Sequence, residues 1–166
     1  VIVDNFVNSR PEVLERIEKI SGAKVPFYDV DVCDAAALKG VFEAVRPDAV
    51  IHFAALKAVG ESVEKPLEYY RNNVLAVMNV AALMAEHDVR NLVFSSSATV
   101  YGDPEHVPVT EDSPLSATNP YGWTKLMGEQ ILRDVAAADG DRRITLLRYL
   151  NPVCAHESGL TGEDPL

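Results

Sequence analysis

The feature that most limits the fold of this chain is a repeated alternation of short apolar runs with longer stretches of helical periodicity. Apolar runs typical of buried strands occupy residues 1–4, 25–30, 49–54, 92–96 and 144–149. Helical patterns fill the intervals at residues 11–22, 34–45, 65–87 and 120–138. Strands and helices that alternate with short connections predict an α/β fold, a doubly wound parallel sheet with helices on both faces.

Both ends of the sequence suggest that the folding unit continues beyond them. Residues 1–4 read as a strand that is already under way, and residues 162–166 add no closing element. A chain of 166 residues is at most one domain. We therefore expect an incomplete version of the sheet.

The charge and hydropathy of the chain limit its partners. Lysine and arginine total 15 against 25 aspartates and glutamates, which gives a formal net charge of -10. A nucleic-acid binder needs a basic face, so we expect no nucleic-acid partner. No apolar run reaches the roughly 20 residues of a membrane span, so we expect no membrane partner.

The cysteines and histidines do not show the spacing of a metal site. Cys33 and Cys154 lie far apart and outside any CxxC pattern. They are expected to be free thiols in a reducing compartment, which favours the cytoplasm. The histidines at positions 52, 87, 106 and 156 share no ligand spacing, so we predict no metal. His52 lies inside a strand and is interpreted as a hydrogen-bonded core residue.

Polar residues lie where the first expected strands end, which is where parallel sheets bind ligands. Asp4 ends the first strand, where its carboxylate can accept both ribose hydroxyls of adenosine and repel an additional phosphate; it could equally be a turn former. Residues 5–9 add short polar groups able to bond a phosphate or ribose. Asp31 follows the second strand and could accept from an adenine amino group, or only prepare the helix cap at Asp34.

The third strand ends in the small residues Ala54 and Ala55, followed by Leu56 and Lys57. Small residues let the backbone approach a planar ring or a pyrophosphate, and Lys57 could meet a phosphate, although a single lysine is often only solvated. The nine glycines form no GxGxxG loop, which normally precedes the strand-end acid by about 20 residues. We therefore predict a dinucleotide site whose strand, glycine-rich loop and helix lie upstream of Val1.

A second group of residues favours proton transfer. Ser97 ends the fourth strand, and Tyr121 and Lys125 share one face of the helix that follows a long polar loop. A nearby ammonium and a positively charged nicotinamide would lower the pKa of the phenol and let it act as a base, while Ser97 orients the reacting hydroxyl. A Tyr-x-x-x-Lys pair alone is common by chance, but its place after a serine-tipped strand in a parallel pattern favours catalysis.

Over nearly its whole length the sequence resembles the UDP-galactose 4-epimerase family, whose members are also called UDP-glucose 4-epimerases. The similarity is carried by residues 3–5, 8–9, 52–62, 65–70, 72–73, 95–102, 120–122, 125 and 148–152. The Leu-Lys-Ala-Val-Gly-Glu-Ser run within residues 52–62 separates this family from related dehydratases and decarboxylases. The resemblance implies that residues 1–166 are part of a Rossmann-like, NAD-binding domain of the extended short-chain dehydrogenase/reductase class.

The resemblance also implies an isomerase that acts at C4 of a UDP-hexose. Hydride leaves C4 for NAD, the 4-keto sugar turns about its diphosphate link, and hydride returns to the other face. Tyr121 would be the base, Ser97 its partner and Lys125 the electrostatic and ribose contact; Ser97, Tyr121 and Asn151 would touch the UDP-sugar. The residues implied to line NAD are these three catalytic residues together with Asp4, Asn5, Phe6, Val7, Asn8, Ser9, Asp31, Val32, Phe53, Ala54, Ala55, Leu56, Lys57, Asn72 and Leu150.

The chain departs from the family pattern in three residues and in extent. Ala55 and Cys154 stand where the family has glycine, and Leu150 stands where it has phenylalanine. The family's opening βα unit and its C-terminal substrate domain are absent. In the 3-2-1-4-5-6 strand order, the missing strand would separate residues 1–4 from residues 49–54 and leave exposed edges. We therefore predict that the 166-residue chain alone binds NAD poorly and does not turn over.

Two other functions remain open. One is another sugar-nucleotide enzyme of the same fold, such as a uronate epimerase or a decarboxylase. The other is a non-catalytic NAD-binding module, against which the intact Ser97, Tyr121 and Lys125 set argues, because a sensor needs no base. A homodimer through the helices that begin at Pro66 and Pro120 is also predicted, because their apolar content exceeds what one buried face needs.

Overall fold

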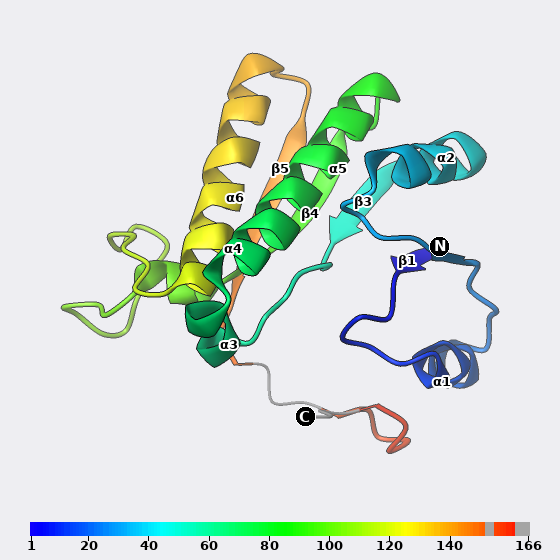
Figure 1. Ribbon diagram of the computed structural model, residues 1–166, viewed down its shortest axis with the longest axis horizontal. Helices are drawn as coiled ribbons and strands as arrows, with labels where there is room; N and C mark the ends of the chain where they lie inside the picture. The colour runs from blue at the N-terminus through cyan, green and yellow to red at the C-terminus, as the bar shows by residue number, and fades with distance from the viewer. Residues whose placement is uncertain (152–154, 162–166) are drawn as a thin grey trace. The chain divides into compact units, whose positions relative to one another are not determined.

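In the computed structural model, residues 1–151 and 155–161 are described, so the departure expected at Cys154 lies outside the described residues. The chain forms two compact units, of which one is Val32–Leu150 and the other combines Val1–Asp31 with residues after Leu150. Each unit contains one parallel sheet and at least one helix (Figure 1). The predicted α/β class, with an incomplete Rossmann-like parallel arrangement, is confirmed.

The smaller unit contains β1 (Ile2–Asp4), α1 (Glu12–Ser21) and β2 (Phe27–Asp29). The strands pair in parallel, with Ile2 opposite Phe27. β2 is shorter than the sequence suggests and begins after Pro26, which has no N–H to donate to a neighbouring strand. α1 ends at Gly22, whose left-handed φ of 69° is the usual way to close a helix.

The larger unit contains the strands β3 (Ala49–His52), β4 (Asn91–Ser97) and β5 (Arg143–Tyr149), paired in parallel in the order β3-β4-β5. Ser97 lies opposite Tyr149 at the carboxyl end of this sheet. The helices of the unit are α2 (Ala35–Val45), α3 (Val59–Glu64), α4 (Pro66–Tyr69), the π-helical turn η1 (Tyr70–Val74), α5 (Leu75–Glu86), the 3-10 turn η2 (Ala98–Tyr101) and α6 (Pro120–Ala138).

Two helical features differ from the expectation. The helix expected from about residue 65 to 87 contains a π turn at Tyr70–Val74, which widens the helix around the buried Asn73. α3 was not expected, because Val-Gly-Glu-Ser has no apolar helical period. It is held instead by polar contacts, in which the Ser62 hydroxyl donates to Val59 O at 2.6 Å.

Helices α5 and α6 lie side by side across one face of the three-stranded sheet (Figure 1). Leu92, Phe94 and Ser96 alternate along β4 as the buried residues of that face. The opposite face carries Ile51 at 63% exposure and Tyr149 at 40%. The expected cover of helices on both faces is therefore found on only one face within Val32–Leu150, because the described helices of that unit do not cross the other.

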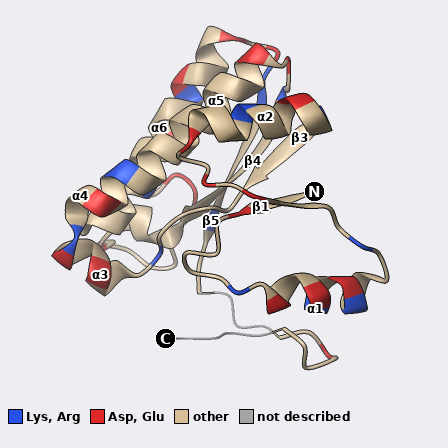
Figure 2. Cartoon of the chain, turned by 45° about the vertical axis from the view of Figure 1, so that its right-hand side comes forward, with Lys and Arg blue, Asp and Glu red and all other residues tan. Residues whose placement is uncertain are grey.

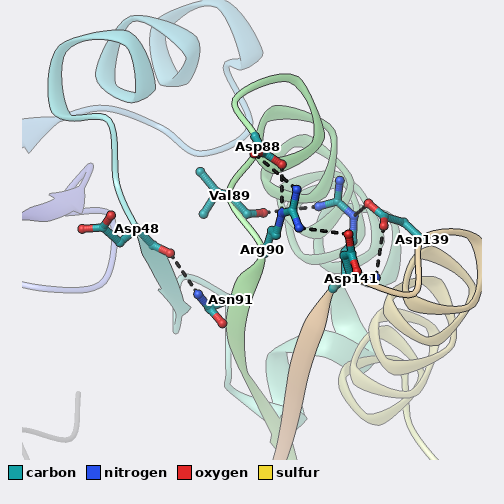
Figure 3. Close-up of polar contacts among 8 residues, drawn as sticks. Asp48, Asp88, Val89, Arg90, Asn91, Asp139 and Asp141 are labelled. Carbon is teal, nitrogen blue, oxygen red and sulfur yellow. Dashed lines mark hydrogen bonds and ion pairs between the residues drawn. The ribbon is translucent and has the colours of Figure 1, made fainter.

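Polar contacts join the amino ends of the strands in this sheet (Figure 3). Arg90 bonds Asp88 at 3.0 Å and Asp141 at 2.9 Å, and the Asn91 amide donates to Asp48 O at 3.3 Å. These contacts involve the connections on that edge and leave the carboxyl ends of the strands for a ligand site. Elsewhere, lysines and arginines are interspersed with acidic residues along the helices (Figure 2).

Candidate active site

Helix α6 brings two predicted catalytic residues to the carboxyl end of β4. Asn119 caps the helix by accepting from the Gly122 N–H at 2.8 Å, and Pro120 occupies the first turn, where its missing N–H costs nothing. Tyr121 and Lys125 follow one turn apart. The local sequence Asn-Pro-Tyr-Gly therefore fixes where the helix begins and, with it, the position of the tyrosine.

The Lys125 amine lies beside Tyr121 and the end of β4. Its Nζ is 5.8 Å from the centroid of the Tyr121 ring, 5.2 Å from that of Phe94, and donates to Ser95 O at 2.8 Å. The lysine is 4% exposed, so its position is fixed by packing. The Ser97 side chain lies near enough to the Tyr121 phenol to act on its pKa. The structure therefore brings Ser97, Tyr121 and Lys125 together, and their catalytic roles stay a prediction.

Burial dominates the electrostatics of this cluster. It raises the pKa of Tyr121 above its ordinary value, and the Ser97 side chain opposes that rise. Burial also lowers the pKa of Lys125 to about 8. The expected lowering of the tyrosine pKa depended on the ammonium together with a bound nicotinamide and stays a prediction. In the protein alone, desolvation of the phenolate outweighs the favourable contribution of Ser97.

The hydroxyl of Ser97 is oriented by its neighbour Thr99. Ser97 is the N-cap of η2, and its Oγ accepts from the Thr99 N–H at 3.2 Å and from the Thr99 hydroxyl at 3.0 Å. These bonds use the serine oxygen as an acceptor and leave its proton to donate. Ser97 is therefore set up to donate to the phenol oxygen or to an oxygen of a bound molecule.

The predicted cofactor residues 53–57 lie beyond the end of β3. Phe53 is 60% exposed, and Ala54 and Lys57 are exposed beside it. The backbone of Leu56 is held on both sides by Asn73, which accepts from its N–H at 2.9 Å and donates to its carbonyl at 3.0 Å. Ala55 is partly exposed within the same segment. This segment is thus open to a ligand and has a fixed backbone.

The other cofactor residues predicted in this unit lie on separate elements. Val32 follows the smaller unit, and its carbonyl accepts from the Asn79 amide at 2.9 Å. Asn72 lies in the π turn, where its amide donates to Asn73 Oδ1 at 3.0 Å and its carbonyl accepts from the Cys33 thiol at 3.3 Å. Leu150 follows β5 and is 70% exposed. Their contacts with a cofactor stay predictions.

In the smaller unit, Asp4 organises the turn that follows β1. Its Oδ1 accepts from the Phe6 N–H at 2.7 Å and from the Ser9 hydroxyl at 2.8 Å, and Asn5 Oδ1 accepts from the Val7 N–H at 3.1 Å. The interpretation of Asp4 as a turn former is therefore correct, and its role toward ribose stays a prediction. The remaining predicted ligand contacts of this unit, Asn8, Asp31 and Asn151, are exposed.

Sequence reasoning missed a set of buried polar residues around the cluster. Ser62 is 0% exposed, Asn73 4%, Thr124 1% and Glu129 1%. Glu129 bonds the guanidinium of Arg148 at 2.9 and 2.8 Å and the Ser96 hydroxyl at 2.6 Å. The available signal was position: Glu129 follows Lys125 by one turn, and Asn73 interrupts an apolar helix, so both fall on faces that should be apolar.

Among the residues that the structure describes, no group of three or more His, Cys, Asp or Glu side chains is placed to hold a metal ion. Within the same part of the chain, no helix is both long and apolar enough to cross a bilayer. The expected cytoplasmic location stays a prediction.

Comparison with known proteins gives the family. A model described as the NAD dependent epimerase/dehydratase family matches residues 2–163. The chain belongs to this family. The predicted resemblance to the UDP-glucose 4-epimerases is confirmed, because the chain is 56% identical over 169 residues to UDP-glucose 4-epimerase 2 of Arabidopsis thaliana. It is 54% identical over 166 residues to the UDP-glucose 4-epimerase of Yersinia enterocolitica.

Solved structures agree with this assignment. UDP-glucose 4-epimerase from Bifidobacterium longum, crystallised in complex with NAD+ and UDP, superposes with a TM-score of 0.95 at 57% identity over 98% of this chain. The match covers 49% of that protein, 48% of the Arabidopsis relative and 49% of the Yersinia relative. This member of the NAD dependent epimerase/dehydratase family thus spans about half the length of the curated relatives it matches.

Proposed function

We propose that the protein carrying this chain is an isomerase that epimerises UDP-hexoses at C4 with NAD as cofactor, and that this chain supplies the catalytic base. The convergence of Ser97, Tyr121 and Lys125 at the carboxyl end of β4 carries the proposal. Identities of 56% and 54% to curated UDP-glucose 4-epimerases support it.

The described residues fit NAD. Phe53 and Ala54 are exposed at the end of β3, where the small side chain of Ala54 lets a flat ring or a pyrophosphate approach the backbone. The Lys125 ammonium has three N–H donors. One of them donates a hydrogen bond to Ser95 O, which leaves two donors for ribose hydroxyls. The carboxylate of Asp4 suits the adenosine ribose of NAD and disfavours the phosphate of NADP.

The mechanism assigns each chain residue one task. When bound, NAD would supply a hydride acceptor for C4 of the sugar. Tyr121 takes the proton of the 4-hydroxyl and gives it back to the opposite epimer. Ser97 donates a hydrogen bond that favours the phenolate, and Lys125 stabilises that negative charge. Asn151 contacts the UDP-sugar.

A Tyr121→Phe substitution tests the base in the protein encoded by the complete reading frame. We expect conversion of UDP-galactose to fall by about 100- to 10,000-fold while NAD still binds. Tyr70→Phe is the matched control, because it removes a phenol from a partly buried tyrosine outside the cluster. Unchanged turnover in Y121F would overturn the assignment.

The same protein separates the alternative functions. Conversion of UDP-galactose without turnover of UDP-glucuronate supports a 4-epimerase of neutral hexoses. Turnover of UDP-glucuronate alone would favour a uronate epimerase or decarboxylase of the same fold. Binding of NAD with no turnover of either sugar would favour a non-catalytic module.

We further propose that the 166-residue chain by itself neither binds NAD tightly nor turns over. Its length is about half that of its relatives, and Ile51 on β3 is 63% exposed on the open sheet face. Exposed apolar strands of this kind need a partner to be stable. Epimerase activity of the purified 166-residue polypeptide would refute this.

A homodimer is the partner that we propose besides the UDP-sugar. α3, α4 and α6 contact one another and carry Val63 at 62%, Leu67 at 82%, and Trp123 and Met127 at 41% exposure. Large apolar side chains that gather on a surface mark interaction sites. We expect the complete protein to have a dimeric mass by light scattering, and Leu67→Asp to shift it toward the monomer; a monomeric wild-type protein would refute the proposal.

A further inference from the structure

Buried polar residues that the proposed mechanism does not use surround Tyr121. Asn73 lies in the π turn at 4% exposure and Thr124 in α6 at 1%. Burying an amide or a hydroxyl costs free energy unless its hydrogen bonds are made inside the protein. The contacts of these residues therefore indicate what their burial achieves.

The amide of Asn73 uses its full hydrogen-bonding capacity. Its Oδ1 accepts from the Leu56 N–H at 2.9 Å and from the Asn72 amide at 3.0 Å. Its Nδ2 donates to Leu56 O at 3.0 Å and to the Thr124 hydroxyl at 3.0 Å. An amide offers two acceptor sites and two protons, and all four are engaged. Asn73 thus clamps the segment after β3 as a neighbouring strand would.

Thr124 extends this clamp to the tyrosine. Its hydroxyl accepts from Asn73 and donates to the carbonyl of Tyr121 at 2.7 Å. The Tyr121 N–H donates to the Ser62 hydroxyl at 3.2 Å, so both backbone groups of the tyrosine are held by buried side chains. A continuous path of hydrogen bonds therefore runs from Leu56 through Asn73 and Thr124 to Tyr121.

We propose that Asn73 and Thr124 are positioning residues that hold the Tyr121 backbone in register with the cofactor segment at Leu56. The proposal rests on the function proposed above, because it takes Tyr121 as the base and residues 53–57 as a cofactor contact. Misplacement of a catalytic group by about 1 Å can cost about 100-fold in rate. The π turn serves this task, because it places the Asn73 amide at the centre of the path.

The first experiment separates positioning from stability in the protein of the complete reading frame. Thr124→Val keeps the side-chain shape and removes the link to Asn73. We expect kcat on UDP-galactose to fall about 10- to 100-fold with KM within about twofold, and Thr124→Ser to restore most of it. An unchanged kcat in T124V, or a loss that T124S does not restore, would overturn the proposal.

Hydrogen exchange gives a readout that does not depend on turnover. Asn73→Ala should speed exchange at the Leu56 and Tyr121 amides together and weaken NAD binding, because the two segments are coupled. Faster exchange at Leu56 alone would contradict the coupling. Asn91→Ala is the matched control, since it removes an asparagine bond to a backbone carbonyl at the amino end of β4. A wild-type protein that does not convert UDP-galactose would refute the proposed function and leave this exchange test intact.

Discussion

The ion pair between Glu129 and Arg148 should be the polar contact on which the larger unit depends most. The Glu129 side chain is 1% exposed and that of Arg148 12%, and two bonds of 2.9 and 2.8 Å join them. The guanidinium also donates to the Tyr101 hydroxyl at 2.9 Å and to Glu111 O at 3.2 Å. The pair therefore ties α6 and β5 to η2 and to the loop that follows it.

Removing Arg148 leaves the buried Glu129 carboxylate with only the longer contact to Arg133 at 3.6 Å, and removing Glu129 leaves the Arg148 guanidinium without its carboxylate. Arg148→Met or Glu129→Leu should each lower the free energy of unfolding by about 3–5 kcal/mol. The double variant should be less destabilised than the sum of the two by up to about 3 kcal/mol, because no unpaired charge remains. Lys65→Met is the control, since its pair with Glu61 on α3 is exposed and should cost about 0–1 kcal/mol.

The pair also predicts a dependence of stability on pH. Burial acts to raise the pKa of Glu129, but hydrogen bonds from Arg148 and Ser96 outweigh it, so the pKa lies below its ordinary value of 4.5. A carboxyl with a lowered folded pKa contributes stability that is present above its unfolded pKa and is lost as pH falls through the folded value. The difference between wild type and E129L should therefore be largest near neutral pH and shrink below about pH 4.

Urea denaturation of the complete protein at several pH values measures these quantities. Additive single variants, within about 0.5 kcal/mol, would refute the reasoning, because the coupling between the two charges would then be absent. A difference between wild type and E129L that stays constant from pH 7 to about pH 3 would refute it as well.

Other changes have equally direct outcomes. Burial lowers the pKa of Lys125 to about 8, so between about pH 8 and 10.5 the unfolded chain binds more protons than the folded protein. Wild type should therefore gain stability relative to Lys125→Met as pH rises through that window, which denaturation at several pH values measures. Gly128→Ala would place a Cβ 2.8 Å from Phe94 Cζ and should cost about 1–3 kcal/mol, with Phe94→Leu recovering part of it in a thermal melt. Gly102→Ala would place a Cβ 1.8 Å from Ser116 O at a φ of 59°, so the loop should shift and activity should fall together with Tm.

The sequence was sufficient for the parts of the fold that depend on apolar period. The strand ending at Ser97 and the helix opening at Pro120 were both located, because β4 alternates buried residues and Asn-Pro marks the start of a helix. α3 was missed, because contacts from distant residues hold it: the Ser62 hydroxyl accepts from the Tyr121 N–H. Such contacts between distant residues leave no local pattern.

For the candidate site, the sequence located residues better than it judged their charge. The spacing of Tyr121 and Lys125 was sufficient to place the amine beside the ring, where the structure has it at 5.8 Å. The expected lowering of the tyrosine pKa combined the ammonium with a bound nicotinamide and stays a prediction. In the protein alone burial raises that pKa, and sequence spacing shows which charges are near but does not show how completely a group is desolvated. Glu129 was missed although it follows Lys125 by one turn, because the sequence does not show the partner on β5 that allows a glutamate to be buried there.

The pKa shifts of Tyr121 and Lys125 have opposite signs, but both favour the neutral form of the side chain. Burial raises the pKa of Tyr121 and lowers that of Lys125 to about 8, so both groups favour their neutral forms more than they would in water. At pH 7 a pKa near 8 still leaves the lysine mostly protonated and therefore charged. The phenol is also protonated at this pH and is therefore neutral. The described residues therefore position the tyrosine without ionising it. Ionisation needs a further positive charge near the ring, and a positively charged nicotinamide would supply it. Under the proposed function, formation of the base would therefore depend on binding of the oxidised cofactor.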